Sequence, residues 1–196
     1  MNLSFENLLR DSFGRPKGLL GKLGGPIMAR ANRASVAWVI KLLAVKPGDC
    51  VLEIGFGPGV GLELLVREAP RAKFSGVDIS EEMLRQAMAR NRAAVDRGQV
   101  ELRLGYAEHL PFPDGAFDKA FSVNSLQVWT DPTAGLREAR RVLKDGGTIA
   151  FGFTRHSGRP KDGLIELFEK VGFAAVRIVD GDECFCVLAN CRKLKP

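Results

Sequence analysis

The sequence has no long hydrophobic run. None of its apolar stretches reaches the roughly 18 residues that a membrane-spanning helix needs, and its N-terminus lacks an apolar region with a cleavage site. The four cysteines lack the spacing of a disulfide framework, which is typical of a reducing compartment. We therefore expect a cytoplasmic protein without a transmembrane segment, in which Cys184, Cys186 and Cys191 are core thiols rather than ligands of a soft metal.

Internal repeats and low-complexity segments are also missing from the chain. Of its 196 residues, 45% are hydrophobic and 27% are charged, a balance that argues against a disordered or fibrous protein. A chain of this length can bury one good core and has little material for a second. These features predict one globular domain with a short extension.

Positive and negative charges balance along the chain except near the N-terminus. Residues 1–48 hold eight Lys or Arg residues against Glu6 and Asp11, so they carry the whole net charge of +6. A clustered excess of this kind indicates a partner surface, whereas a spread excess does not. We expect residues 1–45 to form a basic helical extension and residues 46–196 to form the main domain.

From Cys50 onward, short apolar runs alternate with helix-like ones, which is typical of βαβ units around a parallel sheet. The pattern predicts strands at 50–55, 73–79, 100–106, 117–124 and 147–154. It predicts helices near 59–69, 80–95, 132–143 and 161–171. Two further strand-like runs, 174–180 and 184–191, leave no room for a helix between them and so predict an antiparallel hairpin.

The first predicted strand runs into a glycine-rich turn, residues 53–61, with the sequence EIGFGPGVG. Glycines permit a tight turn and let a ligand touch the backbone, and the N-terminus of the following helix offers free N–H groups. The dinucleotide fingerprint G-x-G-x-x-G, started at Gly55, would need a glycine where this chain has Val60. The spacing therefore argues against a nicotinamide dinucleotide as the ligand.

This turn resembles the first motif of class I S-adenosylmethionine (SAM) methyltransferases, in which Glu-x-Gly-x-Gly-x-Gly closes the first strand. Asp78, at the end of the second predicted strand, resembles the acidic residue that takes the ribose hydroxyls in that family. Residues 105–118 and 140–147 are similar to the family's adenine-side loop and to its turn before the fifth strand. The resemblance covers roughly residues 45–192 and is nearest to the broad group that includes the ubiquinone and menaquinone biosynthesis methyltransferases.

The resemblance implies a Rossmann-like, doubly wound α/β fold with a mostly parallel, seven-stranded sheet that ends in a C-terminal antiparallel hairpin. It also implies an enzyme that binds SAM and releases S-adenosylhomocysteine. The residues that it assigns to the cofactor are Glu53, Gly55, Gly57, Gly59, Asp78, Ile79, Ala107, Glu108 and Asn124. The chain departs from the family at Tyr106, where an acidic residue usually meets the adenine amino group, so Tyr106, Glu108 or the Ala107 backbone would take that role.

Ligands of such sheets gather at the carboxyl ends of the strands, so we expect the methyl acceptor near the residues that follow the fourth and fifth strands. These residues are Asn124, Ser125, Gln127, Trp129, Arg155, His156 and Ser157. His156 is the best-placed general base, because histidine titrates near neutral pH; a solvated surface histidine is the alternative. Trp129 either shapes the acceptor pocket or packs in the core, and core packing is favoured. We predict no metal site.

These features predict methyl transfer to a small-molecule or lipid-like acceptor. A methyltransferase that acts on RNA or protein is an alternative, which the basic residues near the N-terminus favour. A SAM-binding module without catalysis is another, which Tyr106 favours. Residues 1–45 interleave apolar and basic side chains, which suits a lid over the site or a peripheral contact with an anionic membrane surface. A helix that packs on the sheet with a solvated basic face is the alternative for this segment.

Overall fold

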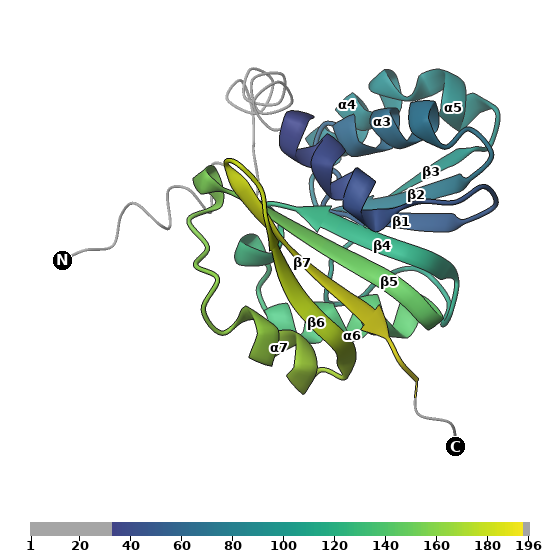
Figure 1. Cartoon of the computed structure of the whole chain (residues 1–196). Helices are drawn as coiled ribbons and strands as arrows, with labels where there is room; N and C mark the ends of the chain where they lie inside the picture. Colours follow the sequence, from purple (N-terminus) through teal and green to yellow (C-terminus); the bar gives the residue numbers. More distant parts are fainter. Residues whose placement is uncertain (1–32, 194–196) are drawn as a thin grey trace.

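Seven strands form one sheet within residues 33–193, the part of the chain that the computed structural model describes, apart from the side chain of His156 (Figure 1). They are β1 (Cys50–Ile54), β2 (Lys73–Asp78), β3 (Val100–Leu104), β4 (Phe117–Val123), β5 (Leu143–Thr154), β6 (Phe173–Asp180) and β7 (Cys184–Cys191). Their order across the sheet is β3-β2-β1-β4-β5-β7-β6. The strands β1 to β5 pair in parallel, whereas β7 is antiparallel to both β5 and β6. This topology confirms the predicted α/β fold with its C-terminal antiparallel hairpin.

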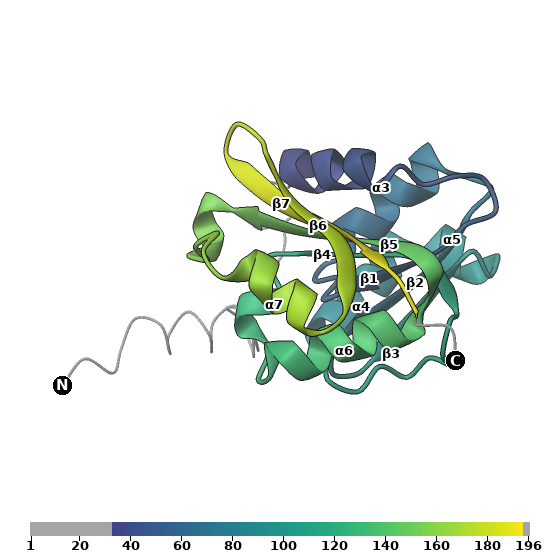
Figure 2. The ribbon, with the colours of Figure 1, turned by 60° about the horizontal axis from the view of Figure 1, so that its bottom comes forward.

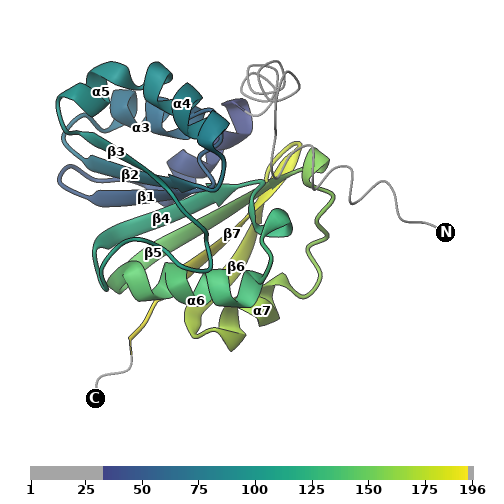
Figure 3. The same ribbon diagram turned by 180° about the vertical axis from the view of Figure 1, so that it is seen from behind.

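Helices cover both faces of the sheet (Figures 2 and 3). One face carries α3 (Val60–Glu68), α4 (Glu81–Arg90), α5 (Arg92–Asp96) and the helical residues 33–43. The other carries α6 (Pro132–Val142) and α7 (Leu164–Lys170). Two short 3-10 turns, η1 (Leu126–Val128) and η2 (Arg155–Ser157), follow β4 and β5. Each face has its own apolar core, so the sheet is buried on both sides, as a parallel sheet requires.

The predicted helix over 80–95 is wrong as one continuous helix. It divides into α4 and α5 at Asn91, whose side chain is buried. The Asn91 Nδ2 atom donates one hydrogen bond to the Ala87 carbonyl and another, of 3.0 Å, to the carbonyl of Gly59. An asparagine side chain competes with the backbone for such carbonyls and therefore favours the end of a helix. The long-range bond to Gly59 is a tertiary contact, which the helical periodicity of the sequence does not reveal.

The predicted strand over 147–154 also begins earlier than expected. Strand β5 starts at Leu143, which pairs with Phe117 of β4 before the register shifts. Gly146, which has a φ of 76°, lies inside the strand. Two successive glycines in this stretch are typical of a turn, and the pairing with β4 overrides that local preference.

The helical residues 33–43 pack on the face of the sheet. Val36, Val39, Ile40 and Leu43 are all buried in the core that α3 and α4 share. A Cβ atom on Gly152 of β5 would lie 2.5 Å from a methyl carbon of Val39, so glycine permits the close approach of helix and strand. Residues 1–32, and with them most of the basic extension, lie outside the described residues.

Two of the three C-terminal cysteines lie in the core. Cys186 and Cys191 are buried in β7, and burial raises the pKa of the Cys186 thiol to about 12. Among residues 33–193 no group of three or more His, Cys, Asp or Glu side chains is placed to hold a metal ion. In the same range no helix is both long enough and apolar enough to span a membrane.

Candidate cofactor and acceptor site

The glycine-rich turn lies between β1 and α3, at the carboxyl end of the sheet. Its three predicted glycines, Gly55, Gly57 and Gly59, all have positive φ angles, of 76°, 52° and 79°. A Cβ atom on Gly55 would lie 2.2 Å from the Ser125 hydroxyl oxygen, and one on Gly59 would lie 2.8 Å from the Ala87 Cβ. A Cβ atom on Gly57 would meet no described atom within 4 Å. The outer two glycines therefore permit close packing, whereas Gly57 borders open space that a ligand can use.

Asp78 ends β2 beside this turn, and both of its carboxylate oxygens accept backbone hydrogen bonds. The Gly57 N–H donates to Oδ2 over 2.8 Å, and the Ser80 N–H donates to Oδ1 over 2.9 Å. Burial raises the pKa of Asp78, although these N–H groups oppose the shift. The two bonds fix the carboxylate in place, and each oxygen keeps a lone pair for a further donor such as a ribose hydroxyl. Ile79, the next residue, is half-buried.

Glu53 lies beneath the turn and is 4% exposed. Burial, reinforced by the charge of Asp78, raises its pKa well above the ordinary value. Its Oε1 leaves no room for a side chain at Gly61, and its Oε2 is buried without a hydrogen-bond partner among the described residues. A buried carboxylate oxygen without a partner favours a donor or a cation. SAM carries both a sulfonium and an ammonium group. The unpartnered carboxylate oxygen of Glu53 and the open space at Gly57 therefore fit this cofactor.

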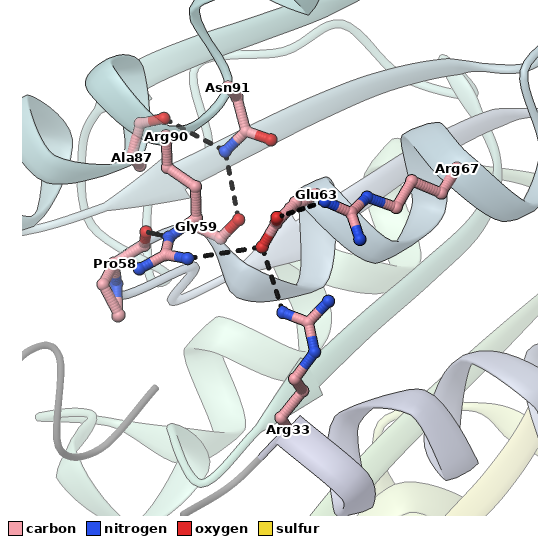
Figure 4. A network of polar contacts seen from close by, with 8 residues as sticks. All are labelled: Arg33, Pro58, Gly59, Glu63, Arg67, Ala87, Arg90 and Asn91. Carbon is pink, nitrogen blue, oxygen red and sulfur yellow. Dashed lines mark hydrogen bonds and ion pairs between the residues drawn. The ribbon is translucent and has the colours of Figure 1, made fainter. Parts of the chain in front are cut away.

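A network of polar side chains from helix 33–43, α3 and α4 contacts the glycine-rich turn (Figure 4). Glu63 of α3 accepts hydrogen bonds from three guanidinium groups, those of Arg33, Arg67 and Arg90. The Arg90 Nε atom also donates to the Pro58 carbonyl over 2.8 Å, so α4 is tied to the turn itself. Burial raises the pKa of Glu63, but the bonds from Arg33 and Arg90 outweigh it and the net shift is downward. Because these side chains are partly exposed, each ion pair is weak; together they connect helix 33–43, α3 and α4 to the cofactor turn.

The sequence-based reading missed this network. The spacing of Glu63 and Arg67 by four residues on a helix was a usable signal for the local ion pair. The bonds to Arg33 and Arg90 join residues that lie 30 and 27 positions from Glu63. No local pattern in the sequence indicates contacts of that range.

The expected adenine-side residues lie in the loop after β3. Ala107 is buried and Tyr106 is 55% exposed, with its carbonyl accepting a hydrogen bond from the His109 N–H. The Glu108 Oε1 atom accepts hydrogen bonds from the backbone N–H groups of Thr130 and Asp131, at 2.7 and 3.0 Å. Glu108 thus holds the loop that leads into α6, and its contact with adenine stays a prediction.

Asn124 connects the carboxyl ends of β4 and β5. It has a φ of 52°, which is uncommon for a residue other than glycine and often marks a functional site. Its Nδ2 donates to the Thr154 hydroxyl, and its Oδ1 accepts from the Thr154 N–H, both over 2.9 Å. The side-chain amide is therefore engaged by β5, and Asn124 sets the spacing of the two strand ends that border the site.

Trp129 packs in the core, as the sequence favoured. Its side chain is 8% exposed and meets Phe151 edge-on, with ring centroids 5.6 Å apart. The indole N–H donates to the Ser125 hydroxyl over 2.8 Å. Gly135 of α6 makes room for the ring, since a Cβ atom there would lie 2.4 Å from an indole carbon. Ser125 is therefore hydrogen-bonded to Trp129 on one side and fills the space beside Gly55 on the other.

A pocket of about 640 Å³ opens beyond the carboxyl end of β5. It is lined by the end of β5, by η2 and the loop after it, and by the turn that joins β6 to β7. Of the predicted acceptor-side residues, Arg155 and Ser157 line it. His156 lies between them in η2, but its side chain falls outside what the structure describes, so its role as a base stays a prediction. Sequence reasoning missed the contribution of the β6–β7 turn, which lies far from η2 along the chain.

The fold and the cofactor turn together define a class of enzyme. A sheet with this strand order, a glycine turn after β1 and an acidic residue at the end of β2 is the arrangement that the resemblance to class I SAM methyltransferases implies. A family model described as a methyltransferase domain matches residues 52–151, about half of the chain. The chain belongs to this methyltransferase family and is a SAM-dependent enzyme.

Individual proteins agree with this assignment. An uncharacterized methyltransferase of Bacillus subtilis, YdaC, is 37% identical over 65% of this chain and 68% of its own length. The ubiquinone/menaquinone biosynthesis C-methyltransferase UbiE of Geotalea daltonii is 28% identical over 60% of this chain and 51% of its own. A SAM-dependent methyltransferase from Aquifex aeolicus has a similar fold, with a TM-score of 0.73 over 96% of this chain and 100% of that chain at 22% identity. The resemblance to the quinone methyltransferases is thereby confirmed at the level of family and cofactor.

Replacing Asp78 by alanine is expected to weaken SAM binding by about 1.5–3 kcal/mol, the usual range for a hydrogen bond to a charged group. The loss combines the ribose contact with the release of the Gly57 and Ser80 N–H groups. Isothermal titration with SAM measures it. Asp96→Ala, which removes an exposed carboxylate at the end of α5, is the control and should bind as the wild type does. Unchanged affinity in the Asp78 variant would show that the ribose is held elsewhere.

Proposed function

We propose that the protein transfers the methyl group of SAM to a small-molecule or lipid-like acceptor. The observation that carries the proposal is the pocket of about 640 Å³ at the end of β5. Because β1, β4 and β5 run parallel, this pocket and the cofactor turn after β1 both lie at the carboxyl edge of these strands. Its volume is in the range of sites that take small ligands. The printed name of the Geotalea relative, a quinone biosynthesis C-methyltransferase, supports an acceptor of this class; this chain spans about half of that relative.

The residues of the chain have distinct tasks in this reaction. When bound, SAM supplies a sulfonium methyl group that is already electrophilic. Asp78 would hold the ribose, the buried Glu53 would offset the positive charge of the cofactor, and Gly57 would leave space for its close approach. Alignment and exclusion of water can then supply most of the acceleration.

Two residues are proposed for the acceptor side. The Gln127 Oε1 atom, in η1 after β4, is buried without a hydrogen-bond partner among the described residues. It can therefore accept a hydrogen bond from a donor group of the substrate. His156 in η2 is proposed as the base for an acceptor that must lose a proton. An acceptor that is already nucleophilic needs no such base.

The test uses whole-cell extract, purified protein and SAM labelled in its methyl group. Mass spectrometry of separated lipid, small-molecule, protein and RNA fractions then shows where the label goes. The proposal expects label in the lipid or small-molecule fraction, and none there with Gly57→Val protein. Label confined to RNA or protein would overturn it.

The remaining alternatives stand differently. Membership of the methyltransferase family sets aside the module without catalysis. The comparisons give no support for the alternative of an RNA or protein substrate or for a contact with an anionic membrane surface. Most of the basic residues that favoured these two alternatives lie outside the described part of the chain. The lid formed by residues 1–45 stays a proposal for residues 1–32, since residues 33–43 are packed on the sheet.

A further inference from the structure

Most charges that line the pocket beyond β5 are already paired. Arg155 of η2 meets Glu183 of the β6–β7 turn over 3.0 Å. Lys161, in the loop after η2, forms an ion pair with Asp180 at the end of β6. Each pair joins the loop after β5 to the β6–β7 hairpin. Within each pair the positive and the negative charge offset each other.

Arg159 is the pocket cation without an ion pair among the described residues. Its Nε atom is buried and has no hydrogen-bond partner there. Its backbone N–H donates to the Ser157 hydroxyl over 3.2 Å, which holds the loop on which the side chain stands. The N–H groups of a guanidinium need acceptors, so a buried Nε–H group without one costs free energy. A bound anion would remove that cost.

The same pocket has an aromatic wall. The ring of Phe185, at the start of β7, is stacked on the buried ring of Phe153, with centroids 5.0 Å apart and planes 18° apart. Phe185 is half-buried and lines the pocket together with Phe153. The Lys161 Nζ atom lies 5.5 Å from the Phe185 centroid. An apolar or aromatic part of a ligand has a surface to contact in the same pocket as Arg159.

Among the acidic residues that line the pocket, Asp182 has no ion-pair partner within the described part of the chain, and it is exposed in the turn between β6 and β7. An exposed carboxylate is well hydrated and screened by salt, whereas the Arg159 Nε atom is shielded from water. The Arg159 Nε atom is therefore less hydrated than the Asp182 carboxylate, although the basic and acidic side chains that line the pocket balance in formal charge.

We infer that this pocket binds the methyl acceptor through an anionic group, a carboxylate or a phosphate, held by Arg159, with an apolar portion of the acceptor against Phe185. The inference rests on the proposed function and adds the chemical class of its substrate. Arginine suits both oxyanions, because its planar fork donates to two oxygens at once. The Asn124–Thr154 bonds keep the end of β5, and so the pocket, next to the end of β4.

The test compares three probes that share one apolar part: 4-phenylbutanoate, 4-phenylbutyl phosphate and the neutral 4-phenylbutanol. Binding to the full chain saturated with S-adenosylhomocysteine is measured by titration calorimetry or ligand-observed NMR. The inference expects at least one anion to bind about tenfold or more tightly than the alcohol, in line with a charge-assisted hydrogen bond. Which anion binds more tightly assigns a carboxylate or a phosphate. Equal binding of all three probes would overturn the inference.

Variants connect the preference to Arg159. Arg159→Gln should bring the anions down to the affinity of the alcohol, and Arg159→Lys should keep part of the preference. Lys170→Gln removes an exposed cation at the end of α7, outside the pocket lining, and should keep it all. SAM affinity serves as the folding control for each variant. A preference that survives in a folded Arg159→Gln protein would contradict the assignment.

Failure of this inference can be told apart from failure of the proposed function. Methyl label in a neutral small molecule, with no preference among the probes, leaves the function standing and removes the anionic acceptor. Probe selectivity that depends on Arg159, with label in RNA or protein alone, overturns the small-molecule function and with it the role of the pocket as an acceptor site.

Discussion

Gly57→Val is expected to abolish measurable SAM binding while the protein stays folded. The φ of 52° at this position disfavours a β-branched residue, and the added side chain would enter the space that borders Asp78 and the turn. No described protein atom lies within 4 Å of the new Cβ, so the steric conflict is with the ligand rather than with the fold. Titration calorimetry with SAM, next to urea unfolding of the same sample, measures both effects.

A matched control separates backbone strain from loss of the ligand space. Gly98 also has a positive φ, of 69°, and its Cβ would likewise meet nothing within 4 Å, but it lies in the exposed turn between α5 and β3. Gly98→Val should lower the free energy of unfolding by roughly the 1–2 kcal/mol that a left-handed residue costs, and should bind SAM normally. If Gly57→Val bound SAM as well as Gly98→Val does, the role assigned to this turn would be wrong.

Trp129→Ala is expected to lower the free energy of unfolding by about 3–5 kcal/mol, the range for removing a large aromatic side chain from a core. The indole is buried between Phe151 and Gly135, and its N–H is bonded to Ser125. Chemical denaturation gives the value. Trp129→Phe keeps most of the volume and loses the bond, so its cost should be nearer 1 kcal/mol.

The same pair of variants distinguishes core packing from an acceptor contact. If Trp129 is a core residue, both substitutions lower the free energy of unfolding. SAM affinity then changes only as far as the loss of the Trp129–Ser125 bond disturbs Gly55, which lies beside Ser125. A Trp129→Ala protein of nearly wild-type stability that had lost turnover would instead place the indole against the acceptor.

Much of the fold followed from local signals. The alternation of apolar runs located the strands to within a few residues, because each parallel strand is a short apolar run bounded by turn residues. Where the observed end of a helix or strand differs from the predicted one, a tertiary contact overrides the local preference. Asn91 ends α4 and bonds to Gly59, and Leu143 belongs to β5 because it pairs with Phe117. In both cases the deciding partner is distant in the chain.

The sequence by itself indicated the cofactor class, through the resemblance of its glycine turn to the first motif of class I SAM methyltransferases. Glu53, the glycines of the turn and Asp78 lie within 26 residues, in one strand–turn–helix–strand unit whose geometry is local. A turn of this kind needs glycine for its positive φ angles, and that demand is visible in the order of the residues alone.

Tertiary structure alone decided what surrounds that turn. The order of strands across the sheet allows Asn124 to bond to Thr154 and Arg90 to bond to Pro58. It also brings Arg159 and Phe185 into the lining of one pocket. These pairs lie 26 to 32 positions apart in the chain, and their approach depends on which strands are neighbours and in what register. Burial has the same origin: the sequence shows a carboxylate at Glu53 and a guanidinium at Arg159, but only packing removes water from Oε2 of the one and Nε of the other.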